Sequence, residues 1–284
     1  WSVRPCGIEL HSVFLLDGWH CCSMEPNPYG VESSANEVAA RSAVRLAFEP
    51  KGDMVNYRHE LRTALRGLGR AHDQVLLAEY ASPDQAHADL ENVLLYNVGA
   101  SAYSHLVDSG VICRRLQSTD SLHHVRYSQT DQVDWPDFHG MVLATSTVVD
   151  APLRSSPLSW WRAFREAIQP ASGQHLGQVA VSVKLGRALQ DYALTALVKP
   201  LMDGLVSALH AHDGSNADHL SALLPDEQAW ELITDPSAAV LGRRRLVRPH
   251  GRGLAWNPAD ERCAAFRILR TTEPEAVTAV VSAF

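Results

Sequence analysis

Acidic side chains that could cap a helix or bind a metal ion stand together in HADLENVLLYNVG, residues 87–99. Asp89 and Glu91, with Asn92 beside them, precede apolar residues at the spacing of an amphipathic helix, which predicts that they occupy its first turn. An aspartate is a favoured N-cap, and the helix dipole stabilises carboxylates in a first turn. Clustered carboxylate oxygens are also the ligands of a hard divalent cation. Taken alone, the segment favours the helix cap.

Two later segments carry further residues of the kinds that such a site would use. LVKPLMDGL (197–205) contains Lys199 and Asp203 four residues apart, which is the spacing of an ordinary helical ion pair. Pro200 in this pattern predicts that the helix begins near residue 199. Asp260 and Glu261 lie in GLAWNPADERCAAFRI (253–268), after a tryptophan and before a strand-like apolar run. Convergence of these residues on the first pair would distinguish a site from a cap.

Strands that alternate with helices must position these residues. Runs rich in Val, Leu, Ile and aromatic residues predict strands at 12–16, 74–80, 141–149, 178–184 and 264–269. Apolar residues at helical spacing predict helices at 36–48, 57–70, 158–168, 194–211 and 273–282. This alternation predicts an α/β (α+β) fold. The connector DAPLRSSP predicts a boundary between an N-terminal half, residues 1–150, and a C-terminal half, residues 151–284.

The two halves share a pattern of apolar spacing. Shifting the chain by 104 residues places residues 75–106 over residues 179–210 without a gap. Val75 then meets Val179 and Leu90 meets Leu194, although few residues are identical. Each segment reads as a strand, a polar loop and an amphipathic helix. The match predicts two similar strand-loop-helix halves in a pseudo-dimer-like arrangement, although generic units of this kind also align by chance.

The halves together resemble Holliday-junction resolvases of the RusA type. That family carries a strand, an Asp-x-Asp-Asn-Leu-x-Lys-x-x-x-Asp helix start and a later acidic pair. The first half resembles the opening of this pattern at Asp89, Glu91 and Asn92, but has Leu95 and Gly99 in place of the lysine and the last aspartate. The second half resembles its close. It has Leu197, Lys199, Pro200 and Asp203, but Ala193, Thr195 and Ala196 at the acidic and Asn positions.

The resemblance covers about a third of the chain and implies a site divided between the two halves. Asp260 and Glu261 stand where the family has its late acidic pair. The family's carboxylates bind magnesium and its lysine assists phosphodiester cleavage. The resemblance thus implies Mg²⁺ as cofactor, Asp89, Glu91 and Asp260 as its ligands, and Lys199 and Asp203 as further catalytic residues. Because neither half has the full set, the site is either completed across the interface between the halves or degenerate.

Basic residues are concentrated in LGRRRLVRPHGR, residues 241–252. Arginine suits phosphate because its fork binds two oxygens at once. A nucleic-acid-binding role would fall on this stretch; its members are Arg243, Arg244, Arg245, Arg248 and Arg252. If 243–248 is a strand, Arg243 and Arg245 share one of its faces. A solvated edge strand, where charge blocks aggregation, is the simpler interpretation.

Bulk composition restricts the class of protein. With 284 residues, 46% of them hydrophobic and 20% charged, the chain can bury a sizeable core. No apolar run approaches the ~18 residues that a membrane span needs. The net charge of −7 opposes generic nucleic-acid binding. Five cysteines without paired spacing favour reduced thiols in the cytoplasm. The chain begins at Trp1 rather than Met, so a targeting segment could precede it.

Three functional classes remain open at this level. The first is a nucleic-acid-associated protein with a nuclease-like metal site, intact or degenerate. The second is a non-catalytic interaction or scaffold protein with a protein partner. The third is a small-molecule enzyme that uses histidine-rich segments such as HAHDGSNADH (210–219). A bound zinc there is disfavoured because no thiolate or second histidine pair completes a tetrahedral site.

Overall fold

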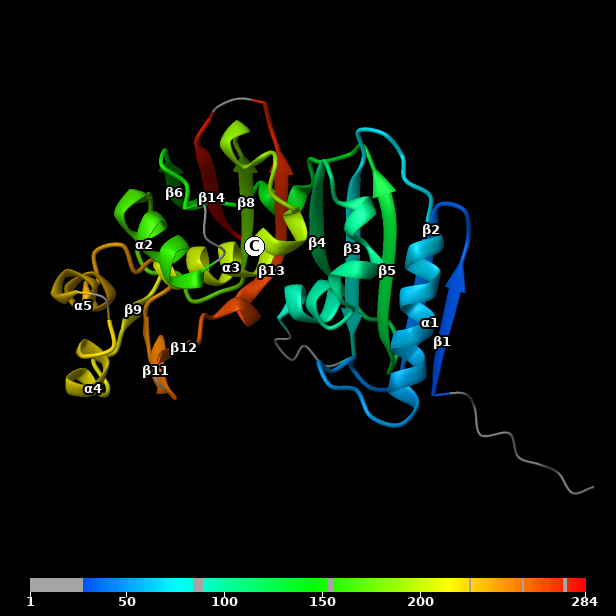
Figure 1. Cartoon of the computed structure of the whole chain (residues 1–284), viewed down its shortest axis with the longest axis horizontal. Coiled ribbons are helices and arrows are strands. Elements are labelled where there is room, and N and C mark those ends of the chain that lie inside the picture. The colour runs from blue at the N-terminus through cyan, green and yellow to red at the C-terminus, as the bar shows by residue number, and fades with distance from the viewer. Residues whose placement is uncertain (1–27, 84–88, 153–155, 225, 252, 273–274) are drawn as a thin grey trace, which may run out of the picture.

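A single large mixed sheet organises the chain (Figure 1). The computed structural model describes residues 28–83, 89–152, 156–224, 226–251, 253–272 and 275–284. The strands of this sheet are β1 (Tyr29–Ser33), β2 (Glu37–Ser42), β3 (Val75–Ser82), β4 (Gly110–Gln117), β5 (His123–Thr130), β6 (Val142–Val148), β7 (Ile168–Pro170), β8 (Val179–Leu185), β13 (Cys263–Arg270) and β14 (Val277–Ala283). The α/β class predicted from the sequence is confirmed.

Helices and short outer strands complete the fold. The α-helices are α1 (Asp53–Gly67), α2 (Pro157–Ala167), α3 (Leu194–Ala208), α4 (Ala217–Ser221) and α5 (Glu227–Thr234). The π- and 3₁₀-helical turns are η1 (Asn92–Tyr96), η2 (Ala100–Ala102), η3 (Ser104–Leu106), η4 (Pro136–Phe138), η5 (Arg187–Leu189) and η6 (Asp260–Arg262). The outer strands are β9 (Ala211–His212), β10 (Arg243–Arg244), β11 (Val247–His250) and β12 (Gly253–Trp256). Among the described residues, no helix has the length and apolar character needed to cross a membrane.

The strand order has the same pairing pattern in both directions from its centre. The order is β1-β2-β5-β3-β4-β13-β8-β14-β6-β7, with β4 antiparallel to β13 in the middle. On one side β4 is parallel to β3, which is antiparallel to β5, and β5 is antiparallel to β2. On the other side β13 is parallel to β8, which is antiparallel to β14, and β14 is antiparallel to β6. Strand β6, which precedes residue 150, therefore pairs within the C-terminal set.

The two segments related by the 104-residue shift agree at the strand and differ at the helix. Strand β3 begins at Val75 and β8 at Val179, as the alignment predicts. After β8, α3 is one continuous helix, whereas the corresponding part after β3 is divided among η1, η2 and η3. Gly99, at a φ of 96°, lies at the break between η1 and η2. The left-handed region is open to glycine because it has no Cβ.

Several local predictions are wrong, and the strand predicted at 12–16 lies outside the described residues. Residues 36–48 do not form a helix, since β2 lies between β1 and β5. Residues 277–283 form strand β14, in keeping with their Val and Thr content, rather than the predicted helix. Helix α3 begins at Leu194 and contains Pro200, so its start near residue 199 is also wrong. The arginine stretch forms two short strands instead of one.

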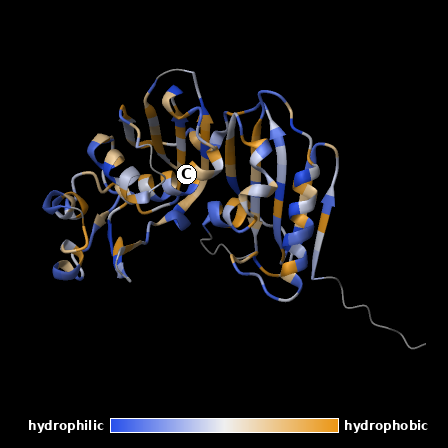
Figure 2. Ribbon diagram, in the orientation of Figure 1, coloured by the Kyte–Doolittle hydropathy of each residue, from blue (hydrophilic) through white to orange (hydrophobic). Residues whose placement is uncertain are grey.

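The principal core lies between the sheet and the helices on one of its faces (Figures 1 and 2). The apolar positions predicted for the two helical segments are all buried: Leu90, Val93, Leu94, Val98, Leu197, Leu201, Val206 and Leu209. A smaller cluster on the opposite face includes Val75, Leu77, Ile112 and Phe138, the last from η4. Both faces of the central strands are thus covered, and these strands hold the candidate site in place.

Gly204 allows α2 and α3 to approach closely. A Cβ at this position would lie 2.5 Å from Cβ of Trp160 and 2.7 Å from the backbone nitrogen of Trp161. Both indole side chains are fully buried. The backbone of α2 therefore occupies the space that any larger residue would need.

We expect Gly204→Ala to destabilise the protein, although alanine is normally the better helix former by ~1 kcal/mol. Overpacking at such a contact costs about 1–3 kcal/mol. Urea unfolding followed by circular dichroism measures the effect. Gly67→Ala is the matched control, because a Cβ at Gly67 meets no atom within 4 Å. A Gly204→Ala variant as stable as the control would contradict the packing.

Candidate functional site: a carboxylate–lysine cluster between the halves

The five residues proposed as catalytic from the sequence converge in the structure. Asp89 and Glu91 come from the turn that leads into η1, Lys199 and Asp203 from α3, and Asp260 from η6, directly before β13. The Nζ of Lys199 lies 2.9 Å from Oε1 of Glu91 and 3.2 Å from Oδ1 of Asp203. The Asp260 carboxyl shares a hydrogen bond with the Asp89 carboxyl. Asp89 and Glu91 follow a strand of the first half of the sheet, whereas the other three residues lie next to strands of the second half.

Asp89 both caps a helical turn and belongs to this cluster. Its Oδ1 accepts a hydrogen bond of 3.2 Å from the backbone N–H of Asn92, and its Oδ2 accepts one from the Asn92 side-chain amide. These are contacts of an N-cap. The same carboxyl meets Asp260. The alternatives of a cap and a site are therefore not exclusive here.

Lys199 contacts two acidic side chains, that of Asp203 on its own helix α3 and that of Glu91 from the other half. The chain has only three lysines, at positions 51, 184 and 199. The side chain of Glu91 is 4% exposed and that of Asp203 12% exposed, whereas that of Lys199 is 33% exposed. Burial acts to lower the pKa of Lys199, but the negative charges of Glu91 and Asp203 outweigh it and raise that pKa. The ammonium group is therefore a fixed positive charge at neutral pH.

Negative charge exceeds positive charge within the cluster. Burial is the largest cause that raises the pKa of Glu91, to about 8, with Asp89 and Asp203 adding to it against the pull of Lys199. Burial also raises the pKa of Asp260, to about 9, and the neighbouring Asp89 carboxyl adds to the shift. Burial likewise raises the pKa of Asp203. Protons therefore remain in the cluster at neutral pH.

A cleft of about 780 Å³ leads to the cluster. Asp89 and Lys199 line its inner part, and Arg244 lies on its wall, paired at 3.3 Å with Glu261. The segment 45–48 and η1 form the other side. Asp89 and Lys199 of the cluster thus face a cleft lined by both polar and apolar side chains, which the sequence did not reveal because its walls come from five separate segments.

The positions in the other half that align with the charged residues of the cluster are uncharged. Under the 104-residue shift, Asp89 corresponds to Ala193, Glu91 to Thr195 and Lys199 to Leu95. Ala193 and Thr195 line a separate cavity of about 360 Å³ at the start of α3. Neither side chain can supply a carboxylate. The three aligned positions are therefore uncharged, although Asp108, Asp191 and Arg270 also line the cavity beside Ala193 and Thr195.

The side chains of the arginine stretch lie in several different environments. Arg244 lies on the cleft, whereas Arg243 lines a different hollow with Gln174. Arg243, Arg245 and Arg248 are exposed. Arg252 lies outside the described residues. Only Arg244 is placed beside the cluster.

The histidines of the 210–219 segment are used structurally. Nδ1 of His210 is 2.9 Å from the carbonyl oxygen of Val206, and burial lowers the pKa of His210 to about 4. His212 is buried and meets the ring of Trp230 edge-on. Across the part of the chain that the structure describes, no three His, Cys, Asp or Glu side chains are already gathered so as to hold a metal ion. A small-molecule enzyme based on these histidines gains no support.

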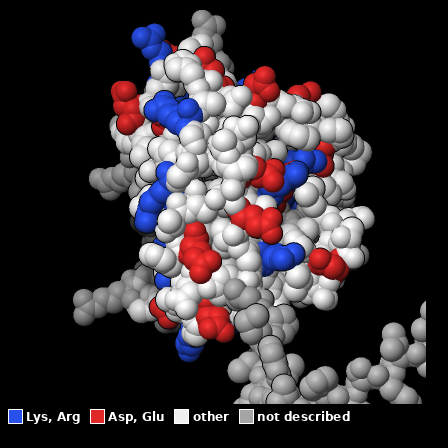
Figure 3. All heavy atoms as spheres, turned by 90° about the vertical axis from the view of Figure 1, so that its right-hand side faces the viewer, with Lys and Arg blue, Asp and Glu red and all other residues white. Residues whose placement is uncertain are grey.

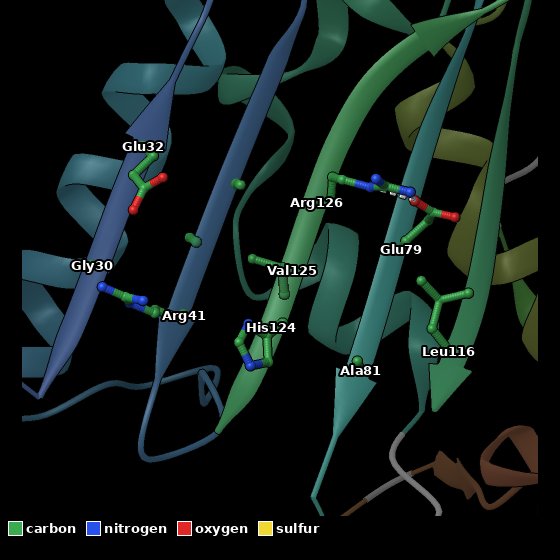
Figure 4. Close-up of a pocket in the computed structure, with 11 residues that line it drawn as sticks. Gly30, Glu32, Arg41, Glu79, Ala81, Leu116, His124, Val125 and Arg126 are labelled. Carbon is green, nitrogen blue, oxygen red and sulfur yellow. Dashed lines mark hydrogen bonds and ion pairs between the residues drawn. The ribbon is translucent and has the colours of Figure 1, made fainter. Parts of the chain in front are cut away.

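A second hollow, of about 290 Å³, lies on the face of β1, β2, β5 and β3 (Figure 4). Arg41, His124 and Arg126 line it, and a dashed contact joins Arg126 to Glu79. Glu79 is also paired at 3.0 Å with Arg114, so its buried charge is matched. Figure 3 shows acidic and basic side chains mixed on the side of the molecule formed by this half. This hollow has no surplus charge of the kind that the cluster carries.

No family model, curated protein sequence or solved structure matches this chain. What the protein does must therefore be inferred from the geometry of the cluster and its cleft.

Proposed function

We propose that this chain is a nucleic-acid-associated protein with a nuclease-like metal site at the cluster. One observation carries the proposal. Five polar residues, separated by up to 171 positions, meet at a buried point where the two halves of the sheet join, with four carboxyls against one ammonium group. Such an imbalance is costly to bury, and strongly shifted pKa values are typical of functional sites.

We further propose that the two halves arose by internal duplication. The strand pairing has the same pattern in both directions from the β4–β13 pair, and the 104-residue shift aligns β3 with β8. The resemblance to RusA-type resolvases divides at the same place, because the first half supplies the acidic opening and the second half the lysine. On this basis the single-chain pseudo-dimer completes one site from two partial motifs.

The donor types of the cluster suit a divalent cation such as Mg²⁺, but among the described residues no three of its carboxyls are gathered around one point, so binding would require them to move together. These donors are carboxylate oxygens, which hard cations prefer. Oε2 of Glu91 is buried and has no hydrogen-bond partner among the described residues. Asp260, whose pKa is raised, forms a side-chain hydrogen bond with Asp89, and a bound divalent cation would take the place of the Asp260 proton. We assign Asp89, Glu91 and Asp260 as the ligands.

Each residue of the cluster would have a separate role in phosphodiester cleavage. A bound divalent cation stabilises the attacking and leaving oxygens of a phosphodiester. Asp89 is held in position by its contacts with Asn92. Lys199 offers a permanent positive charge to a phosphate in the cleft, and Asp203 orients its ammonium group. Its raised pKa makes Lys199 an electrostatic group rather than a base.

A non-catalytic interaction protein is the second candidate function. The observation in its favour is that the cluster is already closed by its own contacts, since Lys199 binds Glu91 and a hydrogen bond joins Asp89 to Asp260. In that case the site is degenerate and the cleft binds a partner without cleaving it. Buried free thiols at Cys113 and Cys263 fit a reducing, cytoplasmic setting under either proposal.

Cleavage assays distinguish the two proposals. Labelled duplex, single-stranded and four-way-junction DNA are incubated with the protein in Mg²⁺ or EDTA, and gel shifts are run in parallel at low and moderate salt. Mg²⁺-dependent products support the first proposal. A shift without products supports a degenerate site, and no shift at low salt removes nucleic acid as the ligand.

We expect replacement of Arg243, Arg244 and Arg245 by Ala to weaken nucleic-acid binding equally for all base sequences. Each arginine bound to a phosphate releases condensed counterions, so the slope of log affinity against log salt should fall by about one for each such arginine that is replaced. Anisotropy titrations at several salt concentrations measure this slope. Arg66→Ala on the exposed side of α1 is the control. An unchanged slope in the triple variant would exclude this stretch from the interface.

A further inference from the structure

Two exposed aromatic rings stack at the mouth of the cleft. The centroids of Phe48 and Tyr96 are 5.1 Å apart and their planes differ by 12°. Phe48 is 56% exposed and Tyr96 is 47% exposed, and both line the cleft. Large aromatic residues normally bury most of their surface in the core or at an interface. This pair instead exposes a flat apolar surface to solvent within the cleft.

Lys199 connects this pair to the carboxylate cluster. Its Nζ lies 5.6 Å from the centroid of the Tyr96 ring and 2.9 Å from Oε1 of Glu91. The ring and the carboxylate therefore both lie close to the same ammonium group. A ligand whose planar part rests on the aromatic pair would place its adjacent charged part at the cluster.

The aromatic pair is held in position by contacts with the backbone. The side-chain amide of Asn97 donates a hydrogen bond of 2.9 Å to the carbonyl oxygen of Leu46. Arg58 donates one of 2.9 Å to the carbonyl oxygen of Phe48. Tyr96 lies at the end of η1, which carries the buried residues Val93 and Leu94. The stacking surface is thus fixed before any ligand binds.

The rest of the cleft combines apolar side chains, such as Leu46 and Val93, with polar groups. Arg45, Asn257 and the Arg244–Glu261 pair line it. A nucleotide has the matching parts, namely a flat base, polar edges and an anionic phosphate. Stacking on an aromatic ring requires the face of the base, which a continuous duplex hides between its neighbours. An unpaired nucleotide can present it.

We propose that the cleft binds an unpaired nucleotide, with its base stacked on Phe48 and Tyr96 and its phosphate beside Lys199. This inference rests on the proposed function, and it identifies the substrate class as nucleic acid with at least one unstacked base at the cluster. DNA and RNA share this chemistry.

Binding to single strands and to a duplex tests the proposal. Fluorescein-labelled 15-nucleotide single strands of DNA and RNA and a blunt DNA duplex are titrated in EDTA at low salt, followed by anisotropy. We expect Phe48→Ala to weaken single-strand binding about tenfold, within the range for loss of one stacked base, and to leave duplex binding within twofold. Phe284→Ala removes a comparably exposed ring outside the cleft and should change neither. A 2-aminopurine in the strand should lose fluorescence on binding to the unaltered protein but not to Phe48→Ala.

Each alternative outcome has a separate meaning. Single-strand affinity that is unchanged by Phe48→Ala, or that falls equally with duplex affinity, overturns the stacking site while the proposed function stands. Absence of binding to any of the three ligands by the unaltered protein overturns the proposed function and this inference with it. A loss confined to RNA or to DNA supports the site and identifies which nucleic acid it takes.

Discussion

Replacing Asp260 with Asn is expected to make the metal-free protein more stable at pH 8 while removing its response to Mg²⁺. In the folded protein the pKa of Asp260 is raised to about 9, above the ~3.9 of an unfolded aspartate. Folding therefore takes up a proton, and the free energy of unfolding falls as pH rises between these values, by up to ~1.4 kcal/mol per pH unit. Asparagine keeps a hydrogen bond to Asp89 and has no charge to lose.

Urea unfolding in EDTA from pH 5 to pH 8 measures this difference. The stability of Asp260→Asn should exceed that of the unaltered protein by an amount that grows with pH. Glu91, whose pKa is raised to about 8, contributes a slope of the same sign, which Glu91→Gln removes. Parallel pH profiles for the variant and the unaltered protein would contradict the raised pKa of Asp260.

Added Mg²⁺ should stabilise the unaltered protein by mass action and should leave Asp260→Asn unchanged. If cleavage occurs, the same substitution should reduce it by about a thousandfold or more, because several kcal/mol of transition-state stabilisation are lost with the ion. Nucleic-acid binding should be largely retained. Equal cleavage by the two proteins would remove Asp260 from the set of ligands.

The second large effect is expected from Lys199→Met. This change removes the ammonium group that Glu91 and Asp203 share, and leaves two largely buried carboxyls without it. Breaking a buried ion pair from one side costs about 3–5 kcal/mol. Because Lys199 is one-third exposed, we expect the lower end of that range at pH 8. The loss should be smaller near pH 5, which is well below the Glu91 pKa of about 8, because Glu91 is then protonated and carries no charge for Lys199 to pair with.

A second substitution distinguishes charge from packing at this position. Glu91→Gln in the Lys199→Met background should recover part of the lost stability, since it removes an unpaired buried charge. Lys184→Met, at an exposed position on β8, is the matched control and should be close to neutral. If Lys199→Met unfolds at the same urea concentration as the control, the cluster contributes nothing to folding.

Sequence patterns predict the elements that carry the cluster better than those at the edges of the sheet. Strands β3 and β8 and helix α3 have strong local signals, since each combines an apolar run with a defined period. The alanines and charged residues of β2 fit both a helical and a strand period, and only pairing with β1 and β5 decides between them. Strands β4 and β5 escape prediction, since polar residues such as Arg114 and Arg126 interrupt their apolar pattern.

The sequence indicates which residues form the candidate site, but it does not indicate which side chains surround them. Asp89, Glu91 and Lys199 stand out because their types match parts of a known motif. Phe48 gives no signal, because a lone aromatic residue in a loop has no spacing from which stacking could be predicted. Its contact with Tyr96 depends on how segment 45–48 passes over η1, which is fixed by long-range contacts such as that of Asn97 with Leu46.

The lack of charge at Ala193, Thr195 and Leu95, which align with charged residues of the cluster, has a consequence for how the protein can change. In a symmetric homodimer every substitution occurs twice, so a residue cannot be lost from one site and kept in the other. In this chain the positions of Asp89 and Ala193 are separate, and each mutates alone. A substitution at Ala193 therefore brings no matching change at Asp89. Conversely, neither half expressed alone carries both the first acidic pair and Lys199, so under the proposed function any cleavage should require the two fragments to reassociate.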